Sequence, residues 1–582
     1  MDWTTHQVFN QYPELSDYHP LATDAALCEA LERAGADWAR PALDTYAARL
    51  GMAETYALAE QANRHTPQLQ RFDTRGRRID ALEFHPAWHQ LMALYRGEGL
   101  ISRPFQDERP GRWAAWAAGF YLHGQVEQGT LCPATMTQAA IPLLRKEPAL
   151  WQSLQSRLYS TAYDPRDLPV ADKASIWLGM GMTEKQGGSD VRANTTVATP
   201  IGTGGRGGEY RLRGHKWFFS APQCDAHLVV ARTGEGGPFA CFYVPRWRPD
   251  GSRNAVRVQR LKDKVGNRSN ASSEVEFEDA WGLLMGEEGR GIPTIIEMAS
   301  YTRLNCVVGS AAILRQATVQ AIHYARRRHA FGKALAEQPL MRAVLADLAL
   351  ESEAALHLAM RLAQAYEDDS TPAQRAWKRV MTPAAKFWVC KRAVELTGEA
   401  MEVLGGNGYV EDGVMARLFR EAPVNSIWEG SGNVMCLDLL RALAREPGCT
   451  EALSAELAAP LGRLPAYDRF AAPLIGKLDA LRGGGADPSA LAAACLDPFG
   501  ARRLAGDLAR AWQAALMILE APPEVSAAFC AGRLDAARAA GDQAFGTLPA
   551  GVDAAAIVAR AMPDSPRAMP SSVSSSSGAS IR

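Results

Sequence analysis

Two glycine-containing stretches carry side chains that could do chemistry. In residues 181–190, Thr183 and Ser189 flank two glycines, and such a loop can bring hydroxyls and backbone N–H groups close to a polar ring or a phosphate. In residues 427–433, the carboxylate of Glu429 stands beside two glycines at the start of an apolar helix. A carboxylate in apolar, water-poor surroundings has a raised pKa, which suits a general base.

Each stretch also has a plain structural interpretation. Gly, Ser and Asp are the usual turn residues, so either loop alone is compatible with an ordinary turn. A glutamate in the first turn of a helix is stabilised by the helix dipole, which would by itself explain Glu429. The functional interpretation therefore depends on several such stretches occurring together in one order.

The elements that must position these stretches change along the chain. Apolar residues recur at helical spacing in the N-terminal third and again after residue 287, whereas short β-rich runs separated by turns occupy the middle. We therefore predict a mainly α protein with a small β-domain. The predicted units are an N-terminal helical domain (1–177), a middle β-domain (178–284), a four-helix bundle (285–445), an extra C-terminal helical domain (446–562) and a disordered serine-rich tail (563–582).

Composition excludes several classes. The formal net charge of −1 gives no global attraction to nucleic acid or acidic membranes. None of the ten cysteines has metal-ligand spacing, so no metal site is expected, and their scatter fits a reduced cytoplasmic compartment. We find no signal peptide at the start and no apolar run of about 18 residues, so no membrane association is expected.

One motif is misleading. Residues 202–207 satisfy the GxGxxG pattern of dinucleotide-binding proteins, but that pattern carries weight only between a strand and a helix. Here the following residues, 210–213, resemble a strand. We predict a flexible hairpin loop.

Five motifs occur in an order that resembles the acyl-CoA dehydrogenase family. They are the loop 182–190, the strand 214–220, the Arg-x-x-Phe-Gly-Lys element 328–333, the glycine turn 404–409 and the stretch 428–431, which has Trp-Glu-Gly-Ser where the family has an aromatic residue, its catalytic Glu, Gly and Thr. The resemblance covers residues 1 to about 445. It implies the acyl-CoA dehydrogenase fold: an N-terminal helical domain, a β-barrel-like middle domain and a C-terminal four-helix bundle.

The resemblance implies FAD as the cofactor. Thr183 and Ser220 would bond to the flavin ring, Phe218 would cover it, and Ser189 would help hold the pyrophosphate. Arg328 and the turn at Gly405 and Gly406 would reach the cofactor of a partner subunit. The full cofactor-binding set is Met182, Thr183, Gln186, Gly188, Ser189, Phe218, Phe219, Ser220, Arg328, Phe331, Gly405, Gly406, Ser431 and Asn433.

The resemblance also implies an acyl-CoA thioester substrate and a role for Glu429 as the base that takes its α-proton. Arg303 matches a family arginine near the substrate pocket, and Trp428 would line that pocket. Trp428 is bulkier than the tyrosine common before the base, which would narrow the acyl site. Ser431 stands where threonine is usual.

A narrower resemblance is to a bacterial adaptive-response branch of this family that has an extra C-terminal domain. It implies binding of double-stranded DNA and protection against alkylation damage, with weak dehydrogenase activity. The candidate DNA contacts are Arg441, Arg502, Arg503 and Arg510. Residues 446–582 contain 12 Arg plus Lys and 14 Asp plus Glu, so the domain as a whole is not basic.

Two functions stay open at this point. One is the DNA-binding flavoprotein just described, and the alternative is a metabolic acyl-CoA dehydrogenase that oxidises a short or branched acyl-CoA at the α,β position with Glu429 as base. The electron acceptor is open in both. The family resemblance implies a homotetramer built as a dimer of dimers, since each flavin site spans two subunits.

Overall fold

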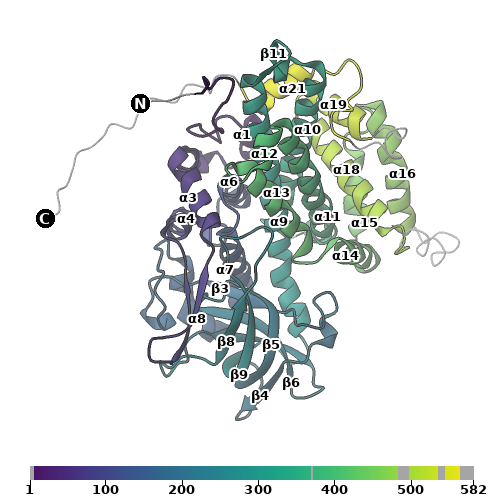
Figure 1. The fold of residues 1–582 in the computed structure, drawn as a ribbon. Coiled ribbons are helices and arrows are strands. Elements are labelled where there is room, and N and C mark those ends of the chain that lie inside the picture. Colours follow the sequence, from purple (N-terminus) through teal and green to yellow (C-terminus); the bar gives the residue numbers. More distant parts are fainter. Residues whose placement is uncertain (1–4, 369–370, 447, 483–496, 535–543, 564–582) are drawn as a thin grey trace.

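The helix α9 (Gly291–Arg327) runs beside the β-domain and through the helical bundle, so it links the two regions that the candidate motifs occupy (Figure 1). The computed structural model describes residues 5–368, 371–446, 448–482, 497–534 and 544–563. The predicted disordered tail lies outside these residues except for residue 563. Within the described residues, no helix is long and apolar enough to cross a membrane.

The N-terminal region is mainly helical, as predicted. Its helices are α1 (Ala25–Arg33), α2 (Arg40–Leu50), α3 (Ala53–Arg64), α4 (Pro86–Gly97), α5 (Arg103–Gln106), α6 (Arg112–Val126), α7 (Leu131–Leu144) and α8 (Pro148–Tyr159). An antiparallel hairpin, β1 (Gln68–Phe72) and β2 (Arg78–Glu83), interrupts them and was not predicted. Polar residues at successive positions hide its alternation, and the hairpin is anchored from outside because Arg78 Nη2 donates to the carbonyl of Val258 at 2.9 Å.

The predicted β-domain is a closed barrel with two added strands. Its strands are β3 (Leu178–Gly181), β4 (Val197–Ile201), β5 (Glu209–Ser220), β6 (Ala226–Thr233), β7 (Phe239–Pro245), β8 (Val256–Leu261) and β9 (Ser272–Met285). The pairings β6–β4, β4–β5, β5–β9, β9–β7 and β7–β6 close a ring, while β3 pairs with β6 and β8 with β9. The GxGxxG stretch connects β4 to its antiparallel partner β5, which confirms the predicted hairpin loop.

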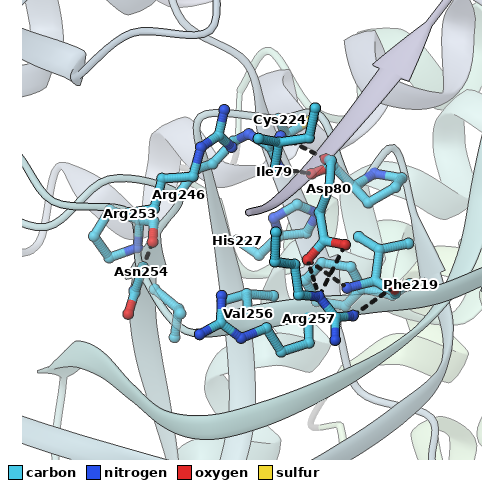
Figure 2. A pocket seen from close by; sticks show the side chains of 15 residues that line it. Ile79, Asp80, Phe219, Cys224, His227, Arg246, Arg253, Asn254, Val256 and Arg257 are labelled. Carbon is cyan, nitrogen blue, oxygen red and sulfur yellow. Dashed lines mark hydrogen bonds and ion pairs between the residues drawn. The ribbon is translucent and has the colours of Figure 1, made fainter. Parts of the chain in front are cut away.

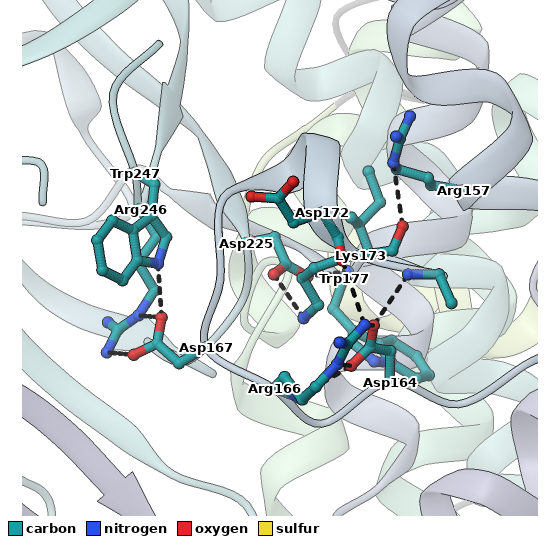
Figure 3. Close-up of polar contacts among 12 residues, drawn as sticks. Arg157, Asp164, Arg166, Asp167, Asp172, Lys173, Trp177, Asp225, Arg246 and Trp247 are labelled. Atoms are coloured by element: carbon teal, nitrogen blue, oxygen red, sulfur yellow. Dashed lines mark hydrogen bonds and ion pairs between the residues drawn. The ribbon is translucent and has the colours of Figure 1, made fainter. Parts of the chain in front are cut away.

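Polar contacts join the barrel to the segment between α8 and β3 (Figure 3). Asp225 accepts from Lys173 Nζ at 2.7 Å and from the backbone N–H of Trp177 at 2.7 Å, and both charged side chains are buried. Asp167 accepts from Arg246 and from the indole of Trp247. These contacts fix the segment that leads into β3, and therefore the start of the loop at 182–190.

The helical bundle follows the barrel. It consists of α9, α10 (Pro339–Gln364), α11 (Pro372–Val403), α12 (Gly406–Tyr409), α13 (Val414–Ile427) and α14 (Gly432–Arg445). A two-residue hairpin, β10 (His329–Ala330) and β11 (Lys333–Ala334), lies at the end of the bundle opposite the barrel (Figure 1). Glu429 lies in the short connection between α13 and α14.

The extra C-terminal helices pack against one side of the bundle (Figure 1). They are α15 (Cys449–Ala458), α16 (Pro465–Arg482), α18 (Ala501–Glu520), α19 (Pro523–Arg533) and α21 (Ala554–Ala561). Buried ion pairs hold them, since Arg533 contacts Asp347 at 2.5 Å and Glu351 at 3.0 Å. Burial alone would raise the pKa of Glu351, but Arg392 and Arg533 hold it at about 2.

Candidate active site

Glu429 is half-buried and is held in place by α9. Its Oε2 accepts a hydrogen bond from the hydroxyl of Thr302 at 2.5 Å, and its carbonyl accepts from Arg303 Nε at 3.0 Å. Burial raises the pKa of the Glu429 carboxyl, although the Thr302 hydrogen bond and the charges of Lys386 and Arg303 oppose this. The carboxylate therefore does not point into bulk solvent, and it has the environment that a base for a weakly acidic proton needs.

The backbone of Glu429 is strained. Its φ of +59° lies in the left-handed region, and Gly430 follows with φ of +107°. A side chain in this region costs about 1–2 kcal/mol relative to a right-handed conformation. The surrounding contacts must compensate for this cost, which indicates that the direction of the carboxylate is imposed by tertiary structure.

The loop at 182–190 lies directly beside the strand at 217–220. The backbone N–H of Trp217 donates to the carbonyl of Thr183 at 2.9 Å. A buried ion pair ties them further, since Lys216 Nζ lies 2.7 Å from Glu184 Oε1 and neither side chain is exposed. Glu184 also accepts from the backbone N–H groups of Thr195 and Thr196. Neither Glu184 nor Lys216 was among the site residues predicted from the sequence.

Other residues of the loop lie as follows. The side chain of Gln186 is used within the loop, where it donates to Glu184 and to the carbonyl of Ala193. A Cβ at Gly188 would lie only 2.9 Å from Thr183 Oγ1, so a larger residue would displace that side chain. Ser189 is exposed, and the carbonyl of Met182 accepts from Asn194.

The two phenylalanines of β5 face opposite ways. Phe218 is 54% exposed beside Trp217, with Lys262 Nζ 4.8 Å from its ring centroid. Phe219 is buried in the barrel core, stacked on His227 with a centroid distance of 3.9 Å. It lines a cavity of about 20 Å³, room for one water, between β2 and the barrel (Figure 2). The structure thus gives the side chain of Phe219 a packing role instead of the cofactor contact that the sequence predicted.

Cys132, on α7, lies near both Glu429 and Ser220 of the β-domain. The pKa of this thiol is raised to about 12, mainly by burial and in part by the charge of Glu429, while the charge of Lys264 and a hydrogen bond with Ser220 oppose the rise. Both side chains therefore lie close to Cys132. Ser220 Oγ is also 3.4 Å from Ser272 Oγ. The structure brings Glu429, Ser220 and the 182–190 loop into one region.

The predicted substrate residues contact protein groups. Arg303 is buried and donates to the Glu429 carbonyl and, at 2.8 Å, to Asp438. Arg303 therefore holds the backbone of Glu429 in place. The indole of Trp428 donates to Asn425 Oδ1 at 3.0 Å, which holds its ring next to the Glu429 connection.

The predicted cofactor residues Arg328, Phe331, Gly405 and Gly406 lie far from the 182–190 loop in space. Arg328 follows the last residue of α9, 26 positions after Thr302, which corresponds to about 39 Å along the helix. Arg328 donates to the carbonyl of Asn10. Phe331 is 97% exposed, and both Gly405 and Gly406 lie at the surface. These residues cannot contact the same flavin as the 182–190 loop of their own chain.

The predicted DNA contacts divide into exposed and buried residues. Arg441, Arg502 and Arg503 are exposed. Arg510 is buried, pairs with Asp507 at 2.5 Å and lies over the ring of Trp388, so its predicted contact with DNA is wrong for this structure. Its guanidinium is used where α18 packs on α11.

Asn433 and Ser431, both predicted to bind the cofactor, stand at the start of α14. Ser431 is its N-cap residue, and Asn433 Oδ1 accepts from Arg502 Nη1 at 2.8 Å. The extra C-terminal domain therefore makes a direct contact with α14, the helix that follows Glu429.

Comparison with known proteins identifies the family. The chain matches the acyl-CoA dehydrogenase middle domain over residues 179–280 and the C-terminal domain over 289–444, and the adaptive response protein AidB N-terminal domain over 10–165. It is 50% identical over 471 residues to the putative acyl-CoA dehydrogenase AidB of Escherichia coli, which covers 81% of this chain and 86% of that protein. The chain belongs to the acyl-CoA dehydrogenase family. Within the family it is AidB-like.

Solved structures agree with this assignment. The structure of Caenorhabditis elegans ACDH-11 in complex with C11-CoA matches with a TM-score of 0.80 and 26% identity, covering 91% of this chain and 94% of that one. An acyl-CoA dehydrogenase from Bacillus anthracis complexed with FAD has the same fold, with a TM-score of 0.59, 17% identity, and coverage of 76% of this chain and 80% of that one. The predicted fold class, including the extra C-terminal helices, is confirmed.

Members of this family are FAD oxidoreductases, and FAD is the cofactor. The residues present fit it. The half-exposed ring of Phe218 lies on the strand beside a loop with hydroxyls at Thr183 and Ser189. A side chain at position 188 would collide with Thr183, and Gly188 leaves the loop backbone uncovered there. Thr183, Ser220 and Phe218 would hold the ring, and Ser189 the phosphates.

Proposed function

We propose that the protein oxidises an acyl-CoA thioester at the α,β position, with Glu429 as the base. When bound, FAD supplies the hydride acceptor, so loss of an α-proton and a β-hydride leaves an α,β-unsaturated thioester. The observation that carries the proposal is the half-buried carboxylate of Glu429, which the hydroxyl of Thr302 holds in the same region as the Ser220 strand. Arg303 and Trp428 hold the connection that bears it.

The test is anaerobic bleaching of the flavin absorbance by a panel of saturated acyl-CoA thioesters, from short and branched to long chains. Bleaching by at least one of them, with the enoyl product identified by mass spectrometry, supports the proposal. A flavin-loaded protein that no thioester bleaches would contradict it. The panel also identifies the acyl chain, which Trp428 is expected to restrict to short or branched groups.

The rate should depend on pH through Glu429. Burial raises the pKa of this carboxyl, so the base is protonated and inactive until the pH exceeds a value above that of an ordinary glutamate. The Thr302 hydrogen bond opposes this rise, so Thr302→Val should move the acid limb of kcat/KM upward by about one pH unit, since a hydrogen bond to a charged group contributes about 1.5–3 kcal/mol. An unchanged limb in Thr302→Val would show that another group controls it.

We propose that the cofactor site is completed by a second subunit, within a homotetramer. Arg328, Phe331, Gly405 and Gly406 are too far from Glu429 to serve the same flavin in one chain. Phe331, Leu340 and Tyr409 are exposed at this end of the bundle by 97%, 85% and 80%, which supports an interface there.

Arg328→Ala should therefore weaken FAD binding by about tenfold, the effect of losing one charge-assisted hydrogen bond. Equilibrium dialysis with FAD measures this, and light scattering checks the assembly. Arg327→Ala is the matched control, since Arg327 is the exposed neighbour on the same helix. Equal FAD affinity in Arg328→Ala and the wild-type assembly would contradict the shared site.

We propose double-stranded DNA as a second ligand, with protection against alkylation as its consequence. The support is the exposure of Arg441, Arg502 and Arg503 on α14 and α18, together with the AidB-like identity. Any contact would be to phosphates, because the arginines follow no recognition-helix pattern.

Arg502→Glu/Arg503→Glu should lower duplex affinity at least tenfold and reduce its salt dependence. Fluorescence anisotropy at several salt concentrations measures both. Arg469→Glu is the control, an exposed arginine on α16 of the same domain. An equal loss in the control would show that only net charge matters. Protection is tested by counting methylated bases in duplexes treated with a methylating agent, with wild-type or double-variant protein.

A further inference from the structure

Lys386, on α11, contacts the connection that carries Glu429. Its Nζ donates to the carbonyl of Trp428 at 2.6 Å and to the carbonyl of Gly430 at 2.5 Å. The side chain is 1% exposed, and both acceptors are uncharged backbone oxygens. A buried ammonium is costly, so its retention at this place calls for an explanation.

The two acceptors lie on either side of Glu429. Fixing the Trp428 carbonyl sets the peptide plane before the Glu429 Cα, and fixing the Gly430 carbonyl sets the orientation of the connection after it. Arg303 Nε donates to the carbonyl between them, that of Glu429. Three successive carbonyls are thus held by two buried cations, across the residues with φ of +59° and +107°. Contacts of this kind hold a strained conformation that the chain would otherwise leave.

Arg303 is itself fixed from the other side. Its Nη1 donates to Asp438 Oδ2 at 2.8 Å, and Asp438 Oδ1 accepts from Arg379 at 2.6 Å. Within the part of the chain that the structure describes, Lys386 Nζ donates to backbone carbonyls and forms no salt bridge with a carboxylate. Its ammonium acts on the Glu429 carboxylate, whose pKa is raised by burial and lowered by the Thr302 hydrogen bond and by the charges of Lys386 and Arg303.

We propose that Lys386 is a positioning residue that holds Glu429 in its left-handed conformation and keeps its carboxylate available as a base. The inference rests on the proposed function of Glu429. A purely structural role is the alternative, because the Trp428 carbonyl also ends α13 and the last carbonyls of a helix need donors. That role would stabilise the fold without affecting the carboxyl of Glu429.

The groups that face the Glu429 carboxyl come from three elements. Thr302, Arg303 and the thiol of Cys306 lie on α9, Lys386 on α11, and the thiol of Cys132 on α7. Burial raises the pKa of both thiols, so they stay neutral through the useful pH range. Replacing Lys386 by a neutral residue therefore removes one of the two cations that oppose protonation of Glu429.

The first measurement does not depend on turnover. Difference infrared spectra over a pH series, with Glu429→Gln to assign the carboxyl band, give the titration midpoint of Glu429. Lys386→Gln keeps a donor for one carbonyl and loses the charge, so the midpoint should rise by about one pH unit. Lys386→Arg keeps the charge and should stay near the wild-type midpoint. Lys378→Gln is the control, a lysine two turns earlier on α11 over the Tyr366 ring.

The second measurement follows the proton without any hydride transfer. A thioester of 3,3-dimethylbutyrate has α-hydrogens but no β-hydrogen, so Glu429 can exchange the α-proton for deuterium from D₂O while no oxidation is possible. Lys386→Met should slow this exchange by at least tenfold at pH 7, with flavin content and far-UV circular dichroism unchanged. Lys386→Gln is used if the methionine variant does not fold.

The outcomes separate the two hypotheses. Wild-type protein that exchanges no α-hydrogen contradicts the proposed function, while the infrared midpoint still decides the role of Lys386. A wild-type midpoint and wild-type exchange in the neutral variants overturn the proposal. A lower thermal stability with an unchanged Glu429 midpoint in Lys386→Gln also overturns it, in favour of a structural cap.

Discussion

Glu429→Gln should lower the rate of flavin bleaching by the preferred acyl-CoA about 10³-fold, within the 10²–10⁴-fold typical of a general base. The amide has the shape of the carboxyl and can still accept from Thr302, but it cannot take the α-proton. FAD content should stay at the wild-type level, because Glu429 is not among the predicted cofactor residues. Stopped-flow absorbance under anaerobic conditions measures the rate.

The control for this substitution is Glu402→Gln, an exposed glutamate on α11, which should bleach at the wild-type rate. If Glu429→Gln retained more than a tenth of the wild-type rate, the base would have to be another group. No other carboxylate contacts the hydroxyl of Thr302 in the described part of the chain.

Lys216→Met should destabilise the β-domain by about 3–5 kcal/mol and release FAD, because it leaves Glu184 buried without its positive counter-charge. Burial alone would raise the pKa of Glu184, and the charge of Lys216 holds it at about 2. The pair also fixes the 182–190 loop against β5, so the loss should appear as a lower temperature of flavin release. Flavin fluorescence during heating measures it.

Three further variants make this prediction specific. Glu184→Gln/Lys216→Met removes both charges and should recover part of the lost stability, and together with Glu184→Gln it completes the cycle that gives the coupling between the two side chains. Arg213 lies on β5, as Lys216 does, and forms an exposed ion pair with Asp279 on β9. Arg213→Met breaks this pair and should cost less than about 1 kcal/mol. A Lys216→Met protein that holds FAD to the wild-type temperature would show that the buried pair does not maintain the loop.

Local sequence was sufficient where the signal is carried by neighbouring residues. The change from helical to alternating spacing predicted the β-domain, and the strand-like residues after 202–207 predicted a hairpin loop there. The family motifs placed the 182–190 loop, β5 and Glu429 in one site, and the structure brings them together. The β1–β2 hairpin was missed because β1 is mostly polar and exposed, and because β2 depends on a contact with β8.

Tertiary structure decided what each side chain does there. Glu184 and Lys216 are 32 positions apart, and Thr302 and Glu429 are 127 apart, so no spacing rule relates them. Phe218 and Phe219 look alike in the sequence, but successive side chains of β5 point to opposite faces, and the closed barrel makes one of those faces its core. Arg510 is buried because α18 packs on the bundle. Motif order thus determined the family and predicted which carboxylate acts as the base, whereas pairing, burial and backbone strain arise only when distant segments pack.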